Sequence, residues 1–548
     1  MTQAVWINFQ PIGRRIQVYP GMTLLEAARE AGIALTAVCG GAGVCGACRV
    51  RLISGTLSSP GSDEVNLLGA DALAQGLRLA CFSCPLTDVW VEIPPESLST
   101  TQRLQLEGQE NGILLDPGET RSFPGIPLPA RSVPLGLALD LGSTKLAAYL
   151  MNLETNEILG RAGATNPQIP YGEDVISRIA YSNSHPDGGK KLQHLLVEQV
   201  QMLAEQLCEE AGFSPASIVD VVAVGNTVIH HLLCGLPVRQ LGAAPYEPAM
   251  KEALDFPAVE IGLEFAPGTR LYLPPNIAGF VGADHVAMLI GCGLAQAIAR
   301  CEQRPALAAV DIGTNTEISL YARGIHYCCS CASGPTFEGA HIRDGMRAAP
   351  GAIEHIWAKG DSLHIQTIDD LSPVGICGSG ILDGVASLLD LGLLNRRGIL
   401  QGNHTRLAGE GRHARFILAH AGKGVNSEVA ITRADVNEVQ LAKSAIRAGL
   451  EVLLNHAGLE PGDLHEIIIA GAFGTYLDVR SAIRVGMFPL LPVERFRQVG
   501  NAAGTGARAI LCSTGQRRLA EHVGEKAEYV ELTTYPQFQD IYINSLSF

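Results

Sequence analysis

The chain has 548 residues, of which 47% are hydrophobic and only 5% aromatic, and its formal net charge is −15. This length is enough for several domains with large cores. The acidic balance argues against nucleic acid or an anionic membrane as a partner.

The cysteine content indicates a reducing environment. Fourteen cysteines would suggest disulfides in a small secreted protein, but this chain is large. The segment Met1 to Trp6 lacks the shape of a signal peptide, and no uninterrupted apolar run approaches about 18 residues. We therefore expect free thiols and a cytoplasmic location, with no membrane contact.

Residues 1–94 are predicted to form one small domain. The segments Val5 to Phe9 and Arg15 to Tyr19 alternate in polarity around a Pro-Ile-Gly turn signal, which predicts a β-hairpin. Thr23 and Glu26 have the spacing of a capping box, which predicts the start of a short helix. Two further strands are predicted, Arg49 to Ile53 and Asp88 to Ile93.

A glycine-rich loop in this domain carries three cysteines, and a fourth follows later: Cys39, Cys45, Cys48 and Cys81. Their pattern, C-x5-C-x2-C…C, has one residue more in its first gap than the plant-type [2Fe–2S] spacing. The glycines let the loop wrap a cluster, adopt positive φ and direct N–H groups at sulfur. We expect the four thiolates to be the metal ligands of a [2Fe–2S] cluster.

Three alternatives to this ligand set stay open. The four cysteines could be buried thiols near a turn, or they could bind zinc, although zinc usually takes paired C-x2-C halves. Cys84 could replace Cys81 as the fourth ligand. The order of hairpin, helix and cysteine loop resembles the β-grasp [2Fe–2S] ferredoxins, and this resemblance places Cys81 at the ligand position. It implies a one-electron carrier.

Residues 95–134 are predicted to be a linker. The stretch is rich in proline and shows no persistent hydrophobic period. Its length would let the cluster domain move between two partners, or it could simply pack on the surface.

From Leu135 onward, strands alternate with helices, and one motif occurs twice. Each copy is an apolar strand, an Asp-apolar-Gly-Ser/Thr turn and a second apolar strand. The copies begin at Asp140 and Asp311, so the body is predicted to be a duplicated α/β domain. We expect residues 135–305 to form a first subdomain and 306–548 a second.

The repeated turn suits a nucleoside triphosphate. Its glycine lets the backbone approach closely, and its N–H groups and hydroxyls can bind phosphate oxygens. Asp140 and Asp311 are the predicted catalytic carboxylates because an aspartate at the strand end can hold hydrated Mg2+. Two facing copies would clamp the phosphates, whereas two ligand-free β-turns are the alternative.

A third motif follows the buried strand Ile467 to Ile469, at Gly471, Ala472 and Gly474. In this order the three motifs resemble the actin, sugar-kinase and heat-shock ATPase superfamily, over about residues 135–515. The resemblance implies a ribonuclease H-like fold with ATP in the cleft between two lobes. The implied cofactor-binding residues are Gly142, Ser143, Thr144, Lys145, Gly313, Thr314, Asn315, Thr316, Gly378, Gly471, Ala472 and Gly474.

Several side chains could have either a functional or a purely structural role. Glu338, the third predicted catalytic residue, could orient the attacking water or lie on a helix surface. Lys145 could neutralise phosphate charge or be solvated. His230 and His231 could bind metal or act as bases, but packing at a helix start is favoured. Cys328, Cys329 and Cys331 could bind metal, but a buried strand is favoured.

The ferredoxin-like domain joined to the two-lobed body resembles one family over nearly the whole chain, the reductive activators of corrinoid enzymes. The resemblance implies ATP-dependent one-electron transfer from the [2Fe–2S] cluster, which returns an inactive Co(II) corrinoid protein to Co(I) for methyl transfer. It also implies a low-potential electron donor and a homodimer. A small-molecule kinase, or a chaperone-like ATP switch with a redox-sensing ferredoxin domain, is the alternative.

Overall fold

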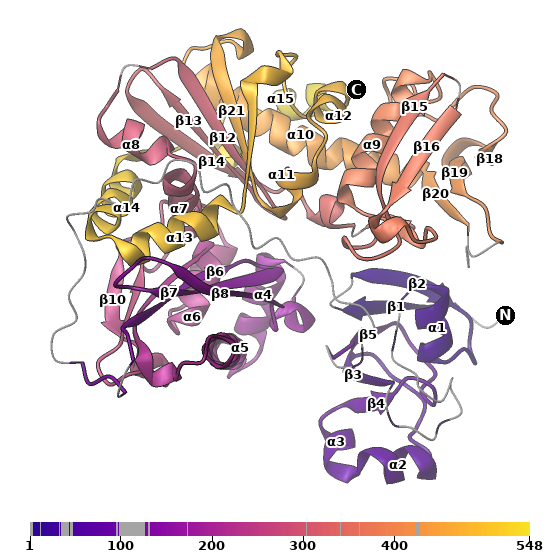
Figure 1. Cartoon of the computed structure of the whole chain (residues 1–548). Coiled ribbons are helices and arrows are strands. Elements are labelled where there is room, and N and C mark those ends of the chain that lie inside the picture. Colours follow the sequence, from indigo (N-terminus) through magenta and orange to yellow (C-terminus); the bar gives the residue numbers. More distant parts are fainter. Residues whose placement is uncertain are drawn as a thin grey trace.

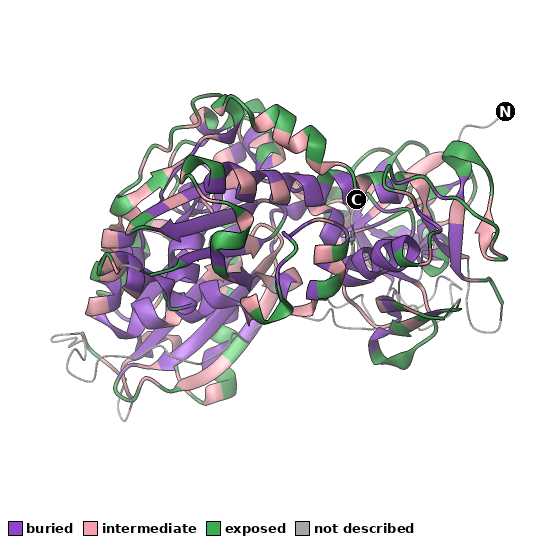
Figure 2. Cartoon of the chain, turned by 90° about the horizontal axis from the view of Figure 1, so that it is seen from above, coloured by how far each residue is buried: buried purple, intermediate pink, exposed green. Residues whose placement is uncertain are grey.

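The computed structural model covers the whole chain. It describes residues 4–10, 13–31, 33, 35, 43, 46, 48–94, 97, 126–129, 132–172, 174–302, 304–339, 341–360, 362–422 and 428–548. Figure 1 shows three parts, a small N-terminal domain, a first lobe and a second lobe. The strands and helices inside each part are mostly buried, and the exposed residues lie on the outer faces (Figure 2). Each helix that the structure describes is too short or too polar to cross a bilayer.

The N-terminal domain is a five-stranded sheet in the order β2-β1-β5-β3-β4. The predicted hairpin and helix are confirmed, and the helix has the full capping box between Thr23 and Glu26. The short elements α2, α3 and β4 were not predicted. The elements are β1 (Val5–Gln10), β2 (Arg14–Val18), α1 (Leu24–Glu30), β3 (Arg49–Ser54), α2 (Ser62–Leu68), α3 (Ala70–Ala74), β4 (Leu77–Leu79) and β5 (Val89–Glu92).

The first lobe is built on a six-stranded sheet in the order β10-β11-β9-β6-β7-β8. The strands are β6 (Leu135–Leu141), β7 (Lys145–Asn152), β8 (Ile158–Thr165), β9 (Ile218–Gly225), β10 (Leu254–Pro257) and β11 (Arg270–Leu273). The helices are η2 (Ile169–Tyr171), α4 (Val175–Ser184), α5 (Gly188–Ala211), α6 (Thr227–Leu233), α7 (Ala283–Gly291) and α8 (Leu294–Ala299), with short turns η3 (Pro215–Ser217), η4 (Arg239–Gly242) and η5 (Ala258–Ile261).

The second lobe repeats this design in the sheet β22-β21-β12-β13-β14-β23. In both lobes the motif strand pairs antiparallel with the next strand and parallel with a later one, β6 with β7 and β9, β12 with β13 and β21. The duplicated fold is thereby confirmed. The strands are β12 (Ala306–Ile312), β13 (Thr316–Ala322), β14 (Ile325–Cys331), β21 (Leu464–Ala470), β22 (Phe496–Gly500) and β23 (Ala527–Tyr529).

Two three-stranded sheets, β16-β15-β17 and β18-β19-β20, extend the second lobe. Their strands are β15 (Ala352–Lys359), β16 (Ser362–Thr367), β17 (Gly375–Ile376), β18 (Leu407–Ala408), β19 (Arg415–Ala419) and β20 (Val429–Thr432). The helices of this lobe are η6 (Pro335–Glu338), α9 (Gly378–Asp390), α10 (Arg433–His456), α11 (Ala472–Tyr476), α12 (Val479–Arg484), α13 (Ala502–Cys512), α14 (Thr514–Lys526) and α15 (Phe538–Ser545). Five short turns complete it: η7 (Ile368–Asp370), η8 (Gly411–His413), η9 (Pro461–Asp463), η10 (Val493–Arg495) and η11 (Leu532–Thr534).

Helices α7 and α13 join the two lobes. They cross at glycines, where the two backbones approach too closely for a side chain. A Cβ on Gly506 would lie 1.8 Å from the carbonyl oxygen of Ala287, and a Cβ on Gly291 would lie 2.0 Å from the carbonyl oxygen of Ala502. Helix α13 follows the second-lobe strand β22 in sequence but packs against β6 and β9 of the first lobe. One hydrophobic core therefore continues from lobe to lobe behind the cleft.

Candidate functional site

A cleft between the lobes brings together most of the predicted nucleotide residues. The β6–β7 turn forms one wall and the β12–β13 turn the other, so the two copies of the motif face each other. The predicted residues that line it are Asp140, Gly142, Ser143, Thr144, Lys145, Asp311, Gly313, Thr314, Asn315, Glu338, Gly378 and Gly471. The turns are tight: a Cβ on Gly142 would lie 2.6 Å from the Lys145 carbonyl oxygen.

Two of the predicted residues are placed differently. Thr316 lies behind the wall, fully buried, and its hydroxyl shares a 2.8 Å hydrogen bond with Ser333 Oγ. Gly474 packs on Ile469, whose Cγ2 lies 2.8 Å from where a Cβ would stand. Ala472 is the first residue of α11.

Glu338 lies between the two phosphate loops. It ends the short helix η6, and one of its carboxylate oxygens accepts a 2.9 Å hydrogen bond from Thr144 Oγ1. The other oxygen accepts from Thr314 Oγ1. A single carboxylate thus links one hydroxyl group from each lobe.

Four acidic side chains form the floor of the cleft: Asp140, Asp284, Asp311 and Glu317. Burial, with repulsion from Asp140, raises the pKa of Asp311 to about 7. Burial raises the pKa of Asp140 to about 6, although Asn501 donates to it, and the pKa values of Asp284 and Glu317 also rise. Burial disfavours the charged form of all four carboxylates, and repulsion between neighbouring carboxylates adds to the shifts of Asp284, Asp311 and Glu317.

These carboxylates fit a divalent cation that keeps its water. Among the residues that the structure describes, no three Asp, Glu, His or Cys side chains converge closely enough to bind a metal directly. Mg2+ prefers few carboxylates together with water and phosphate oxygens, so the floor suits hydrated Mg2+ beside a phosphate chain.

Basic groups border the phosphate loops. The pKa of Lys145 falls to about 8 because burial and the nearby Arg347 disfavour its charge, while Glu338 favours it. Arg178, on α4, donates to the carbonyl oxygens of Gly172 (2.9 Å) and Ser143, and so holds the first phosphate loop in place. Arg347 lines the cleft from the second lobe.

Asn501 is a functional residue that the sequence reasoning missed. Its amide donates 2.8 Å to Asp140 Oδ2, 361 residues away in the chain, while its Oδ1 caps α13 by accepting from Gly504 N at 2.7 Å. The missed residues Asp284, Arg178 and Arg347 also reach the site from distant segments. A strand followed by Gly-Asn, as at Gly225-Asn226 and Gly500-Asn501, is the signal that could have indicated Asn501.

Aromatic rings and glycines form the remaining wall. Phe337 and Phe473 stack with their ring centroids 4.7 Å apart, and both line the cleft. Gly471 has φ +91°, and a Cβ there would lie 2.8 Å from Asp311 Oδ1, so only glycine fits. A Cβ on Gly378, at the start of α9, would lie 1.8 Å from the Phe337 carbonyl oxygen. This flat surface suits a base and ribose.

Two of the predicted cluster ligands lie at the same end of a pair of antiparallel strands in the N-terminal domain. Cys48 precedes β3 and Cys81 follows β4, and Ala80 N donates to Cys48 O at 2.8 Å. Glu64 positions this strand end because it pairs with Arg78 at 2.9 Å and accepts from Leu79 N at 2.7 Å. Cys39 and Cys45 lie outside the described residues.

The described part of the cysteine loop shows the expected backbone. Gly43 and Gly46 have φ +75° and +66°, the left-handed region that favours glycine. A Cβ on Gly43 would stand 2.3 Å from the ring of Phe82, next to Cys81. Cys84 instead has its Sγ 3.7 Å from the Gly21 carbonyl oxygen.

The remaining candidates are packing residues. Cys328, Cys329 and Cys331 lie buried in β14, as predicted, and burial raises the pKa of each thiol. His230 and His231 lie buried in α6, where burial lowers the pKa of His230 to about 3.

Family models match three consecutive parts of the chain. Residues 7–86 match the 2Fe-2S iron-sulfur cluster binding domain, residues 135–297 the RACo middle region, and residues 306–548 the C-terminal domain of RACo, the ASKHA domain. The first match contains all four predicted cluster ligands.

Individual relatives match three quarters or more of the chain. The corrinoid activation enzyme RamQ of Eubacterium limosum is 29% identical over 594 aligned positions, covering 99% of each chain. The Co(II) methylated amine-specific corrinoid protein reductase of Methanosarcina barkeri is 26% identical, covering 75% of this chain and 77% of the relative. A solved structure titled reductive activator for corrinoid, iron-sulfur protein is 30% identical with TM-score 0.68, covering 99% of this chain and 98% of that one.

Proposed function

Because the chain belongs to the RACo family, with its 2Fe-2S, middle and ASKHA domains, we propose that it is an ATP-dependent reductive activator of corrinoid proteins. One electron would pass from the reduced N-terminal domain to the cobalt of a partner corrinoid protein, so that Co(II) becomes Co(I) and the donor domain is oxidised. A low-potential donor would then reduce the N-terminal domain again.

The observation that carries this proposal is that one chain contains both the cysteine site of the N-terminal domain and the cleft between the lobes. The N-terminal domain places Cys48 opposite Ala80, the residue before Cys81, and the family match over residues 7–86 includes Cys39 and Cys45. The lobes hold facing phosphate loops over an acidic floor. A [2Fe–2S] cluster would supply a one-electron store, and the cleft would hold Mg2+-ATP.

The cleft residues would have separate tasks. Asp140 and Asp311 would hold the hydrated Mg2+, and the glycine and hydroxyl groups of both loops would bind the phosphates. Glu338 would accept a proton from, or orient, the attacking water. Because the phosphates would touch both lobes, ATP and its products would favour different degrees of closure.

ATP is needed because the electron transfer is uphill. Plant-type clusters have reduction potentials of about −400 mV, and the family resemblance implies that the potential of the Co(II)/Co(I) couple is lower still. For one electron, each ~59 mV of mismatch is a tenfold loss in the equilibrium constant. A conformational change that alters the environment of the cobalt or of the cluster would overcome this difference.

The division of the chain into 1–94, 95–134, 135–305 and 306–548 stays a prediction, as do the homodimer and the identity of the electron donor.

The test uses the full chain, purified anaerobically with its cluster. It is mixed with a chemical reductant, Mg2+-ATP and a Co(II) corrinoid protein of a methyltransferase system. We expect the absorbance of Co(I) to grow only with ATP, together with ATP hydrolysis that the corrinoid protein stimulates. ATP hydrolysis without any Co(I), or phosphate transfer to a small molecule, would contradict the proposal and favour the alternatives of a switch or a kinase.

A further inference from the structure

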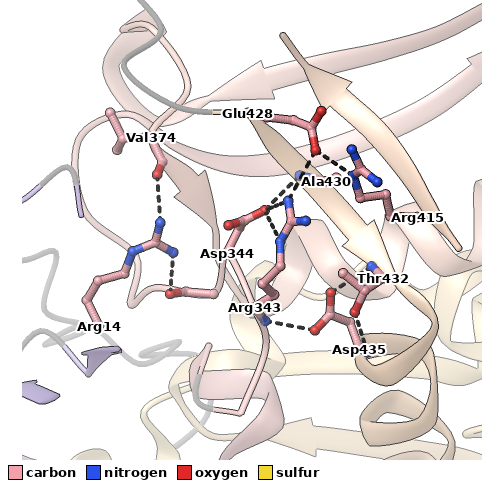
Figure 3. Close-up of polar contacts among 10 residues, drawn as sticks. Arg14, Arg343, Asp344, Val374, Arg415, Glu428, Ala430, Thr432 and Asp435 are labelled. Carbon is pink, nitrogen blue, oxygen red and sulfur yellow. Dashed lines mark hydrogen bonds and ion pairs between the residues drawn. The ribbon is translucent and has the colours of Figure 1, made fainter. Parts of the chain in front are cut away.

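The N-terminal domain contacts both lobes. Strand β5 packs beside η2 of the first lobe. On the other side, Arg14 at the start of β2 reaches into the second lobe, where its Nη1 donates to the Gly345 carbonyl oxygen at 2.9 Å and its Nη2 to that of Val374 at 3.3 Å (Figure 3). The cluster domain therefore spans the two bodies that form the nucleotide cleft.

The Arg14 side chain is buried in this contact. It is 5% exposed, and its Nε donates 3.1 Å to the carbonyl oxygen of Ala31 in its own domain. Asp344 supplies the nearby negative charge that favours the guanidinium, against the cost of burial. A buried guanidinium with three carbonyl acceptors, two of them in another domain, makes a specific docking contact.

The segment around Gly345, which accepts a hydrogen bond from Arg14, is held in place by hydrogen bonds within the second lobe. Arg343 N donates to Asp435 Oδ1 at 2.7 Å, and Asp344 Oδ2 accepts from Ala430 N at 2.8 Å (Figure 3). The side chain of Arg343 pairs with Asp344 and lies 3.7 Å from Glu428. The docking site therefore belongs to the second lobe and is held there by these hydrogen bonds.

This segment is also in direct contact with the phosphate site. A Cβ on Gly345 would lie 1.9 Å from the carbonyl oxygen of Gly339, the residue after Glu338. Arg347 lines the cleft, and its Nε lies 3.6 Å from where a Cβ on Gly13 would stand. Ile376 N donates to Asp344 O at 2.8 Å just before α9 begins at the cleft wall. A displacement of Glu338 is passed to Gly345 through backbone contact.

A bound triphosphate would displace Glu338. Its carboxylate occupies the hydroxyls of Thr144 and Thr314, which are the donors that the loops offer to phosphate oxygens. A phosphate that takes these donors leaves a carboxylate and an anion in contact within a poorly solvated cleft, which is unfavourable. The carboxylate must then leave the two hydroxyls, and a shift of the η6 backbone that accompanies it would reach Gly345 through Gly339.

We propose that ATP binding and docking of the cluster domain through Arg14 oppose each other, so that a bound triphosphate releases the cluster domain from the cleft for its electron acceptor. Arg14 acts as a positioning residue through the segment at Gly345. This inference rests on the proposed function, because it needs a nucleotide in the cleft. Linkage makes the effect reciprocal: loss of docking must tighten ATP binding by the same factor by which ATP weakens docking.

The test compares full-length, cluster-loaded wild type with Arg14→Ala. The affinity for a non-hydrolysable ATP analogue is measured by calorimetry, and amide hydrogen exchange is followed at residues 14–18 and 341–347. We expect Arg14→Ala to bind the analogue at least fivefold more tightly. In wild type, the analogue should increase exchange at both segments. Arg15→Ala is the matched control, because Arg15 is exposed on the same strand with its guanidinium 4.2 Å from the Trp6 ring.

Equal affinity of wild type and Arg14→Ala, or unchanged exchange in wild type with the analogue bound, would overturn the inference. If Arg14→Ala fails to retain its cluster, the wild-type exchange experiment decides alone. Absence of analogue binding to wild type would instead refute the proposed function, so the two failures are distinguishable.

Discussion

Thr144 donates a 2.9 Å hydrogen bond to Glu338, although the two residues belong to opposite lobes of the cleft. Thr314 donates to the other oxygen of the same carboxylate. Glu338 is therefore placed both to hold the lobes together and to act on a water molecule near the phosphates. These two roles predict different effects on binding and on turnover.

We expect Glu338→Gln to lower kcat for ATP hydrolysis about 100-fold, because a neutral amide cannot accept the proton of the attacking water. ATP affinity should stay the same or rise, since the amide does not repel phosphate. Single-turnover hydrolysis and calorimetry measure the two effects separately. Glu209→Gln, at an exposed position on α5, is the control for loss of one acidic charge. Wild-type turnover in Glu338→Gln would refute the assigned role.

Single substitutions can show which cysteines bind the cluster. We expect Cys48→Ser and Cys81→Ser to lose the cluster, because each removes one of four thiolates. Cys84→Ser should retain it, since the Cys84 thiol lies beside the Gly21 carbonyl oxygen. Iron and acid-labile sulfide content and the visible absorption spectrum measure the result. A cluster that survives Cys81→Ser but not Cys84→Ser would reverse the assignment.

The acidic floor predicts how stability depends on pH. The folded-state pKa of Asp311 is raised from 3.8 to about 7, so the folded protein binds this proton more tightly than the unfolded chain does. The stability that the protonated group contributes is full below pH ~4 and is lost as the pH rises through about 7. Asp311→Asn should not show this loss of stability at high pH, because the asparagine amide does not ionise. Without Mg2+ and nucleotide, we expect it to raise Tm by about 2–5 °C at pH 8 and by nothing measurable at pH 4.5.

Thermal unfolding at the two pH values, with and without Mg2+, measures this effect. Added Mg2+ should raise the Tm of wild type more than that of Asp311→Asn, because the cation offsets the repulsion in wild type only. An equal gain from the substitution at both pH values would show that the carboxylate repulsion is absent.

Local patterns predicted the parts of the fold that depend on neighbouring residues. The capping box at Thr23, the first hairpin and the two Asp-containing turns are all short-range features, and the structure contains each of them. The twofold repeat identified the lobes because its two copies use the same strand pairing. Short irregular elements such as α3 carried no such signal.

Long-range partners could not be predicted in this way. Asn501 reaches Asp140 only because α13 returns to the first lobe, and Arg14 reaches Gly345 across 331 residues. Thr316 looked like a loop hydroxyl, but it is the first residue of β13 and points to Ser333. Strand boundaries and chain crossings decide these positions, and a single sequence does not display either.

The crossing of α7 and α13 predicts a strongly destabilising small substitution. In Gly506→Ala the new methyl group would stand 1.8 Å from the Ala287 carbonyl oxygen, so the helices must separate. Overpacking of this kind costs about 1–3 kcal/mol or more, and we expect a clear fall in Tm. Because α13 begins at Asn501, which bonds Asp140, ATP affinity should fall as well. Gly462→Ala is the matched control, since nothing lies within 4 Å of its Cβ position, and it should leave both quantities unchanged. If Gly506→Ala lowered Tm but left ATP affinity at the wild-type value, the helix crossing would stabilise the fold without positioning the acidic floor of the cleft.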